Sequence, residues 1–100
     1  MTYSVEIAAA AEDDIRNAFL WYEDQKVNLG NAFELEINKA IKSIQRNPFK
    51  TKVRYSDIRV FFLDKFPYGI HFKLDDEFIL IIAVFHTSQN PENWPRNGDD

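Results

Sequence analysis

The order of apolar and polar positions predicts a strand followed by two helices in the first half of the chain. Residues 2–7 alternate between the two kinds of side chain, which is typical of a half-buried strand. Apolar side chains then recur at helical spacing over residues 11–22 and again over residues 31–46. Only a short break at residues 27–30 separates the two stretches, so we expect an antiparallel helical hairpin. Pro48 ends the second helix, because the residue before a proline avoids helical backbone angles.

The second half of the chain changes to a period of two and predicts three strands, over residues 58–66, 68–75 and 78–86. Short turns join them, so we expect an antiparallel meander. The last of the three is nearly all apolar, which is typical of a central strand covered on both faces. The order of elements therefore predicts the α+β class: an N-terminal strand, a two-helix hairpin and a meander, with the helices packed on one face of the sheet.

We expect a single domain over residues 1–94, followed by an irregular tail over residues 95–100. The segment after the last strand contains two prolines and a glycine, and Trp94 is its expected anchor to the domain. With 100 residues, of which 45% are hydrophobic and 15% aromatic, the chain can bury one core, and a disordered class is excluded. The sequence has neither an apolar stretch long enough to span a membrane nor a signal-peptide pattern, so we expect a cytoplasmic protein without a membrane partner.

Composition and motifs exclude several kinds of chemistry. The chain has no cysteine and therefore no disulfide, thiolate metal ligand or cysteine nucleophile. Its three glycines are too far apart to form a phosphate-binding loop, and neither a zinc-protease motif nor a nucleophile elbow is present. We interpret the acidic run at residues 12–14 as favourable to the dipole of the first helix rather than as a metal site. We expect no metal and no cofactor.

The net charge of −4 at pH 7 hides a basic middle segment. Residues 50–73 contain six basic and two acidic side chains, whereas the rest of the chain is acidic. Lys50, Lys52 and Arg54 are spaced by two, so an extended backbone would project them to one side. Arg59 follows at the start of the first meander strand. Such cations on a sheet face attract a phosphate backbone or an acidic protein segment, and an ordinary solvated loop is the third interpretation.

The two histidines are the candidates for proton transfer. His86 ends the last strand, where the backbone holds a side chain at an end open to solvent. The alternative for His86 is a strand-end histidine bonded to backbone or water. His71 alternates with Ile70 and Phe72 and therefore points away from the face that these two bury.

In order and spacing, these features resemble the RelE/ParE superfamily of type II toxin–antitoxin toxins, often called plasmid-stabilisation proteins, over nearly the whole chain. The resemblance rests on several short elements: the opening YSVEIAAAAEDDI, the helix residues Ala18, Phe19, Trp21 and Tyr22, the Leu29-Gly30 break with Phe33, Asn47-Pro48, Ile58-Arg59, Phe66-Pro67-Tyr68, Ala83-Val84-Phe85-His86, Asn90-Pro91 and Trp94. The fold of the family, a helical hairpin on a small antiparallel sheet, agrees with the predicted order of elements.

The resemblance implies a small toxin that a cognate antitoxin holds inactive. A heterotetramer is one form that this toxin–antitoxin complex could take. ParE-like members bind and poison DNA gyrase and perform no chemistry of their own. RelE-like members are ribosome-dependent endoribonucleases that cut mRNA without a metal. In these, cations on the concave sheet face stabilise the scissile phosphate while the ribose 2′-OH attacks. A third reading is an inactive relative that only binds its antitoxin.

Carried over residue by residue, the ribonuclease pattern is incomplete. The resemblance leaves Arg59 and His86 as the candidate catalytic residues, and a set of cations for binding RNA or a partner: Lys50, Lys52, Arg54 and Lys73. Ribonucleases of the family usually have an arginine where this chain has Gly69, and another beyond the last strand, where it has Ser88 and Gln89. The missing cations favour the ParE-like branch, with gyrase as the target and the translating ribosome as the alternative.

Two tryptophans are the candidates for contact with the antitoxin or the target. Trp21 lies off the apolar stripe that Phe19 and Tyr22 share on the first helix, so it is either a contact within the helical hairpin or part of a partner surface. Trp94 is the second candidate, in the segment after the last strand.

Overall fold

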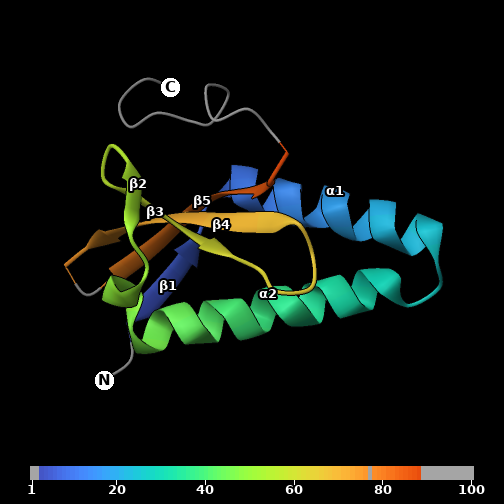
Figure 1. Ribbon diagram of the computed structural model, residues 1–100, viewed down its shortest axis with the longest axis horizontal. Coiled ribbons are helices and arrows are strands. Elements are labelled where there is room, and N and C mark those ends of the chain that lie inside the picture. The colour runs from blue at the N-terminus through green and yellow to red at the C-terminus, as the bar shows by residue number, and fades with distance from the viewer. Residues whose placement is uncertain (1–2, 77, 89–100) are drawn as a thin grey trace.

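The computed structural model, which describes residues 3–76 and 78–88, layers two helices on one face of a five-stranded sheet (Figure 1). The elements follow one another as β1 (Ser4–Ile7), α1 (Ala9–Gln25), α2 (Leu29–Arg46), the 3₁₀ turn η1 (Pro48–Lys50), β2 (Val53–Tyr55), β3 (Ile58–Phe62), β4 (Tyr68–Asp75) and β5 (Phe78–His86). The α+β class, the N-terminal strand, the helical hairpin and the meander are thereby confirmed.

The sheet has the strand order β1-β5-β4-β3-β2. Strands β3, β4 and β5 pair antiparallel, as expected of a meander, whereas β1 pairs with β5 in parallel. The two helices run along the sheet, and their connection lies at the opposite end of the long axis from β2 (Figure 1). Strand β5 is an interior strand, but Leu80 and Ile82 stay partly exposed. The expectation that both of its faces are covered is therefore only partly right.

The core lies between the helices and the sheet. Fully buried aliphatic and aromatic side chains meet there from both layers: Phe33, Ile37 and Ile44 from α2, and Ile70, Phe72, Ile79 and Ile81 from β4 and β5. At one end of this core the ring of Phe33 lies 5.3 Å from that of Phe66 and 5.1 Å from that of Tyr68. Such edge-to-face packing orients the helical hairpin on β4 in addition to burying area.

A single carboxylate organises the connection between the helices. Glu23 accepts hydrogen bonds from the backbone N–H groups of Asn28, at 2.9 Å, and Gly30, at 3.0 Å, so it satisfies orphan donors at the start of α2. The backbones are so close that a Cβ on Gly30 would lie 2.7 Å from the carbonyl oxygen of Phe19. This capped turn starts α2 at Leu29, two residues earlier than the sequence pattern predicts.

Two differences from the expected strands alter the candidate site. Strand β3 ends at Phe62 rather than at residue 66, because the chain turns and buries Leu63 and Phe66 in the core. The three-residue strand β2 was not expected. The condition of an extended backbone over residues 50–54 is met only in part. Lys50 lies in a 3₁₀ turn that begins at Pro48, and its N–H donates to the carbonyl oxygen of Asn47, whereas the chain is extended at Thr51 and in strand β2. Residues 89–100, which include Trp94 and the expected domain boundary, lie outside the described residues.

Candidate functional site

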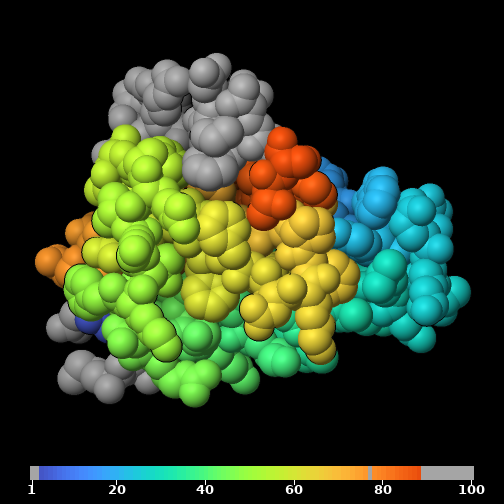
Figure 2. Space-filling model, in the orientation of Figure 1, coloured from blue at the N-terminus to red at the C-terminus, as the bar shows by residue number. Residues whose placement is uncertain are grey.

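Strand pairing decides which side chains share a face of the sheet. Paired residues lie on the same face, so the partners of the core residues Ile70 and Phe72 face the helices. The opposite face, called here the far face, carries the alternate residues, among them Ile58, Val60, Phe62, Gly69, His71, Lys73, Leu80, Ala83 and Phe85. In Figure 2, β3 and the segment after it lie at the centre of one face of the molecule, between residues 50–59 on one side and the end of β5 on the other.

The structure separates the cations that the sequence analysis grouped together. The guanidinium of Arg54 lies 5.2 Å above the ring of Phe62 on the far face, and Lys73 is a half-buried residue of the same face. Lys50 and Lys52 are exposed. The cations of the basic segment are therefore spread over the turn η1, the segment after it and the strands β2, β3 and β4, instead of projecting to one side.

Arg59 faces the other way and binds the chain itself. It pairs with Phe72, a core residue, so it lies on the helix side of the sheet. Its Nη1 donates to the carbonyl oxygen of Thr51 at 2.6 Å, and its guanidinium lies 5.2 Å from the centre of the Phe49 ring. These contacts fasten the segment before β2 to β3, which is a structural use of the positive charge.

His86 also lies on the helix side, at the end of β5. It pairs with Tyr68, and the two rings are 5.2 Å apart. Nδ1 of His86 is 3.0 Å from the backbone N–H of Ser88, which donates to it, and 2.8 Å from the Ser88 hydroxyl. Ser88 therefore holds the imidazole ring of His86 through both its backbone and its side chain.

Arg59 and His86 do not meet in this structure. Their partners on β4, Phe72 and Tyr68, are four residues apart, or about 13 Å at the usual rise of a strand. The two residues also sit on opposite sides of β4, and the guanidinium is held near Thr51. A phosphate held by one would therefore lie beyond the reach of the other.

The far face holds a polar pair that the sequence analysis missed. The hydroxyl of Tyr55 and Nδ1 of His71 form a hydrogen bond of 2.9 Å, and the rings of Tyr55 and Phe85 lie 5.7 and 5.1 Å from the imidazole. His71 does point away from Ile70 and Phe72, yet it is only 1% exposed. Burial lowers the pKa of His71 to about 4 and raises the pKa of Tyr55 to about 12, so both are neutral at pH 7. Because Tyr55 belongs to the unexpected β2, no pattern in the sequence pointed to this pair.

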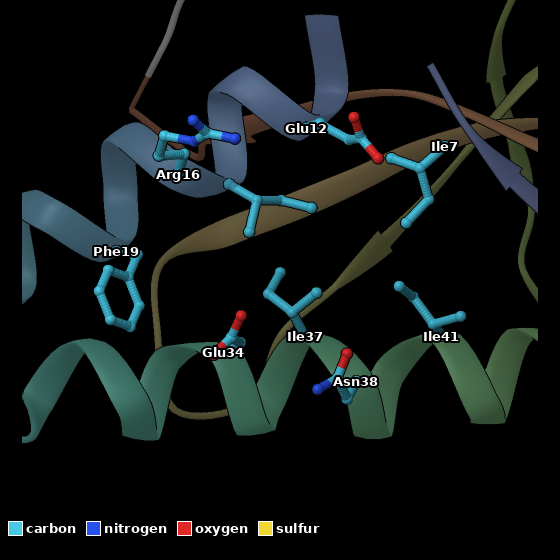
Figure 3. A pocket seen from close by; sticks show the side chains of 9 residues that line it. Ile7, Glu12, Arg16, Phe19, Glu34, Ile37, Asn38 and Ile41 are labelled. Carbon is cyan, nitrogen blue, oxygen red and sulfur yellow. The ribbon is translucent and has the colours of Figure 1, made fainter. Parts of the chain in front are cut away.

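A groove of about 410 Å³ runs between the two helices (Figure 3). Its floor is apolar and includes Ile7, Ile37 and Ile41, whereas Glu12, Arg16, Glu34 and Asn38 stand among its polar lining. In Figure 3, Ile37 and Ile41 rise from α2 toward the space between the helices, and Phe19 reaches it from α1. An apolar floor with a polar rim suits an amphipathic segment of a partner.

A second cavity, of about 340 Å³, lies where α1 crosses the ends of β4 and β5. Trp21, which is 58% exposed, lines it together with Asp14, Tyr68 and His86. Oδ2 of Asp14 accepts a hydrogen bond from the backbone N–H of Val84 at 3.0 Å. Desolvation by burial, with a smaller contribution from the neighbouring charge of Asp13, raises the pKa of Asp14 above its ordinary value despite that bond.

In residues 3–76 and 78–88, no group of three or more histidine, aspartate or glutamate side chains is placed to hold a metal ion. Neither helix of this described part is long and apolar enough to cross a membrane.

Comparison with known proteins identifies the class to which this fold belongs. The structure resembles the chromosomal ParDE toxin–antitoxin system from P. aeruginosa, with a TM-score of 0.69 and 18% identity over 85% of this chain and 96% of the other. It also resembles the toxin–antitoxin complex RelBE2 from Mycobacterium tuberculosis, with a TM-score of 0.60 and 15% identity over 86% of this chain and 99% of the other. At these identities the likeness shows a shared fold.

Sequence comparison places the chain within that class. Toxin ParE2 of Mycobacterium tuberculosis is 28% identical over 92 residues, which cover 91% of this chain and 88% of that toxin. The model of the family described as the ParE toxin of type II toxin–antitoxin systems, parDE, matches residues 5–91. The chain therefore belongs to the ParE toxin family, and the resemblance to the RelE/ParE superfamily is confirmed.

Proposed function

We propose that this ParE-family toxin acts in the cytoplasm by binding and inhibiting DNA gyrase, and that a cognate antitoxin neutralises it. We choose gyrase as the target because the candidate catalytic residues, Arg59 and His86, lie far apart along the sheet. Cleavage of RNA without a metal needs several cations around one phosphate, because they must stabilise its developing charge. Binding to a protein target needs no such arrangement.

The surroundings of Gly69 support the same proposal. Ribonucleases that the sequence resembles carry an arginine at this position of the middle strand. Here a Cβ on Gly69 would lie 2.8 Å from Cγ1 of Val60 and 3.3 Å from the ring of Phe62. Val60 is buried and β-branched, so it cannot turn aside without disturbing β3. The neighbouring strand therefore occupies the space that a larger side chain would need.

Purified toxin is expected to inhibit the supercoiling of relaxed plasmid by gyrase at micromolar concentration, and the antitoxin encoded beside it should restore supercoiling. Arg59→Ala changes a residue that binds the chain itself, so a folded Arg59→Ala variant should keep the inhibition. The ribonuclease alternative is tested by primer extension on translated mRNA. New cleavage sites that vanish in Arg59→Ala, together with unimpaired gyrase, would replace the proposal with a ribosome-dependent nuclease.

The groove between the helices is the surface that we assign to the antitoxin. Membership of the ParE family implies such a partner, and disordered antitoxin segments that fold on binding need an apolar surface to cover. The floor formed by Ile7, Ile37 and Ile41 provides that surface between two stable helices.

Ile41→Glu is expected to weaken antitoxin binding roughly tenfold or more, because it puts a charge into the apolar contact. Isothermal titration calorimetry against the short protein encoded immediately upstream measures the effect. Leu35→Glu is the matched control, since it makes the same change on α2 at a side chain that is 61% exposed and does not line the groove. Equal losses in the two variants would remove the groove from the antitoxin interface.

A further inference from the structure

The second cavity has Asp14 and Trp21 among its lining residues, and neither the gyrase proposal nor the antitoxin proposal gives it a role. Asp14, Asn17 and Trp21 lie at positions i, i+3 and i+7 of α1, so all three project from one side of the helix. Tyr68 and His86 close the cavity from the sheet. A volume of about 340 Å³ is at the low end for a ligand site and suits a single side chain better than a large molecule.

The pairing of the strands explains why Asp14 stands at this place. Strand β1 pairs with β5 only as far as Ile81, where the N–H of Ala8 donates to its carbonyl oxygen at 2.9 Å and the chain turns into α1. Strand β5 continues beyond that point, and the N–H of Val84 donates to Oδ2 of Asp14. Asp14 therefore accepts a hydrogen bond from a backbone N–H of β5 that lies beyond the part of this strand paired with β1. This bond uses only one of its two carboxylate oxygens.

The carboxylate of Asp14 lacks a counter-charge within the part of the chain that the structure describes. The ion pairs found there both involve Glu36, and the two cation–π contacts belong to Arg54 and Arg59. A half-buried carboxylate loses part of its hydration, and a single hydrogen bond offsets only part of that desolvation free energy. Its raised pKa, caused first by desolvation, has the same origin. A cation placed in the cavity would supply the missing interaction.

The aromatic walls favour a flat cation over a compact one. Trp21 and Tyr68 are among the residues that line the cavity. A guanidinium can stack on an aromatic ring while it donates two parallel hydrogen bonds to a carboxylate. Helix α1 also carries five carboxylates and one arginine between residues 9 and 25, so its surface attracts positive charge.

We propose that this cavity receives an arginine side chain of a protein partner, with the guanidinium paired to Asp14 and stacked on Trp21. The proposal does not depend on which partner carries the arginine. A small probe therefore tests it separately from gyrase inhibition.

N-acetyl-arginine methylamide, added to the intact toxin, is expected to shift the NMR signals of the Val84 amide and the Trp21 indole in a saturable way, with a dissociation constant of roughly millimolar order. The citrulline analogue has the same shape without the charge, and it should bind roughly fivefold more weakly or worse. The Asp14 carboxyl should also titrate at a lower pH when the arginine probe is bound, because a neighbouring cation favours the carboxylate.

Asp14→Asn should lower the affinity of the probe roughly fivefold or more, because it removes the charge but keeps an oxygen that can accept from Val84. Asp13→Asn removes an equal charge from the adjacent, exposed residue and should leave the affinity within roughly twofold. The absence of saturable shifts at Val84 and Trp21, or equal binding of the arginine and citrulline probes to the unmodified toxin, would overturn the proposal. Toxin that still inhibits gyrase in that case would show that only this inference had failed.

Discussion

Phe33→Ala is expected to reduce the free energy of unfolding by about 3–5 kcal/mol, the largest effect of any single change proposed for this protein. Phe33 is 0% exposed, and its ring packs against those of Tyr22, Phe66 and Tyr68 at 5.1–5.4 Å. Alanine at this position would lose these ring contacts and leave a cavity between the helical hairpin and β4. Because domains of this size are stable by only about 5–15 kcal/mol, a large fraction of the variant should be unfolded under mild denaturing conditions.

Urea denaturation followed by circular dichroism measures this loss. Leu35→Ala is the matched control, since Leu35 lies on the same helix two residues away but is 61% exposed. Its expected cost is about 0.5 kcal/mol, which is the range of ordinary surface substitutions. Similar losses in the two variants would mean that Phe33 does not join the helices to the sheet as the structure indicates.

The stability of the toxin is expected to fall by about 2 kcal/mol between pH 7 and pH 5 through His71 alone. The pKa of His71 is lowered from 6.5 to about 4 in the folded chain, because burial disfavours the imidazolium. Between these two values the unfolded chain binds a proton that the folded chain does not. The contribution of His71 is therefore complete above pH 6.5, and it is lost progressively as the pH falls toward 4.

Urea denaturation at the two pH values tests this expectation, and substitution of the second histidine, His86, is the control. His71→Gln should remove most of the dependence, because glutamine does not titrate. His86→Gln replaces the other histidine, which is only partly buried at the end of β5, and should retain the dependence. The assignment to His71 is wrong if His71→Gln becomes less stable between pH 7 and pH 5 by as much as the unmodified chain does.

The elements that the sequence predicted well are those with long and regular patterns. Strands β4 and β5 begin and end at the predicted residues, and α2 ends at Arg46 as expected. Strand β2 was missed because three residues are too few to establish a period. Strand β3 was predicted four residues too long, since Leu63 and Phe66 continue the apolar pattern but enter the core from a turn.

The candidate site was less accessible to prediction than the fold. The sequence showed a basic segment and a strand-end histidine, and the family resemblance made Arg59 and His86 partners in one site. Their separation depends on which residue of β4 each one faces. The carboxylate of Asp14 and the amide of Val84 are 70 positions apart in the chain, so no local pattern could join them.

The sequence by itself determined the class of fold, the hairpin of helices, the meander and membership of the ParE toxin family. These follow from periodicity and short motifs, which are properties of neighbouring residues. Only the tertiary structure decided that Arg59 turns toward the helices, that His71 is buried beside Tyr55, and that Asp14 and Trp21 share a cavity. The physical reason is that strand register and helix packing bring distant residues together, and both depend on the whole core rather than on any one segment.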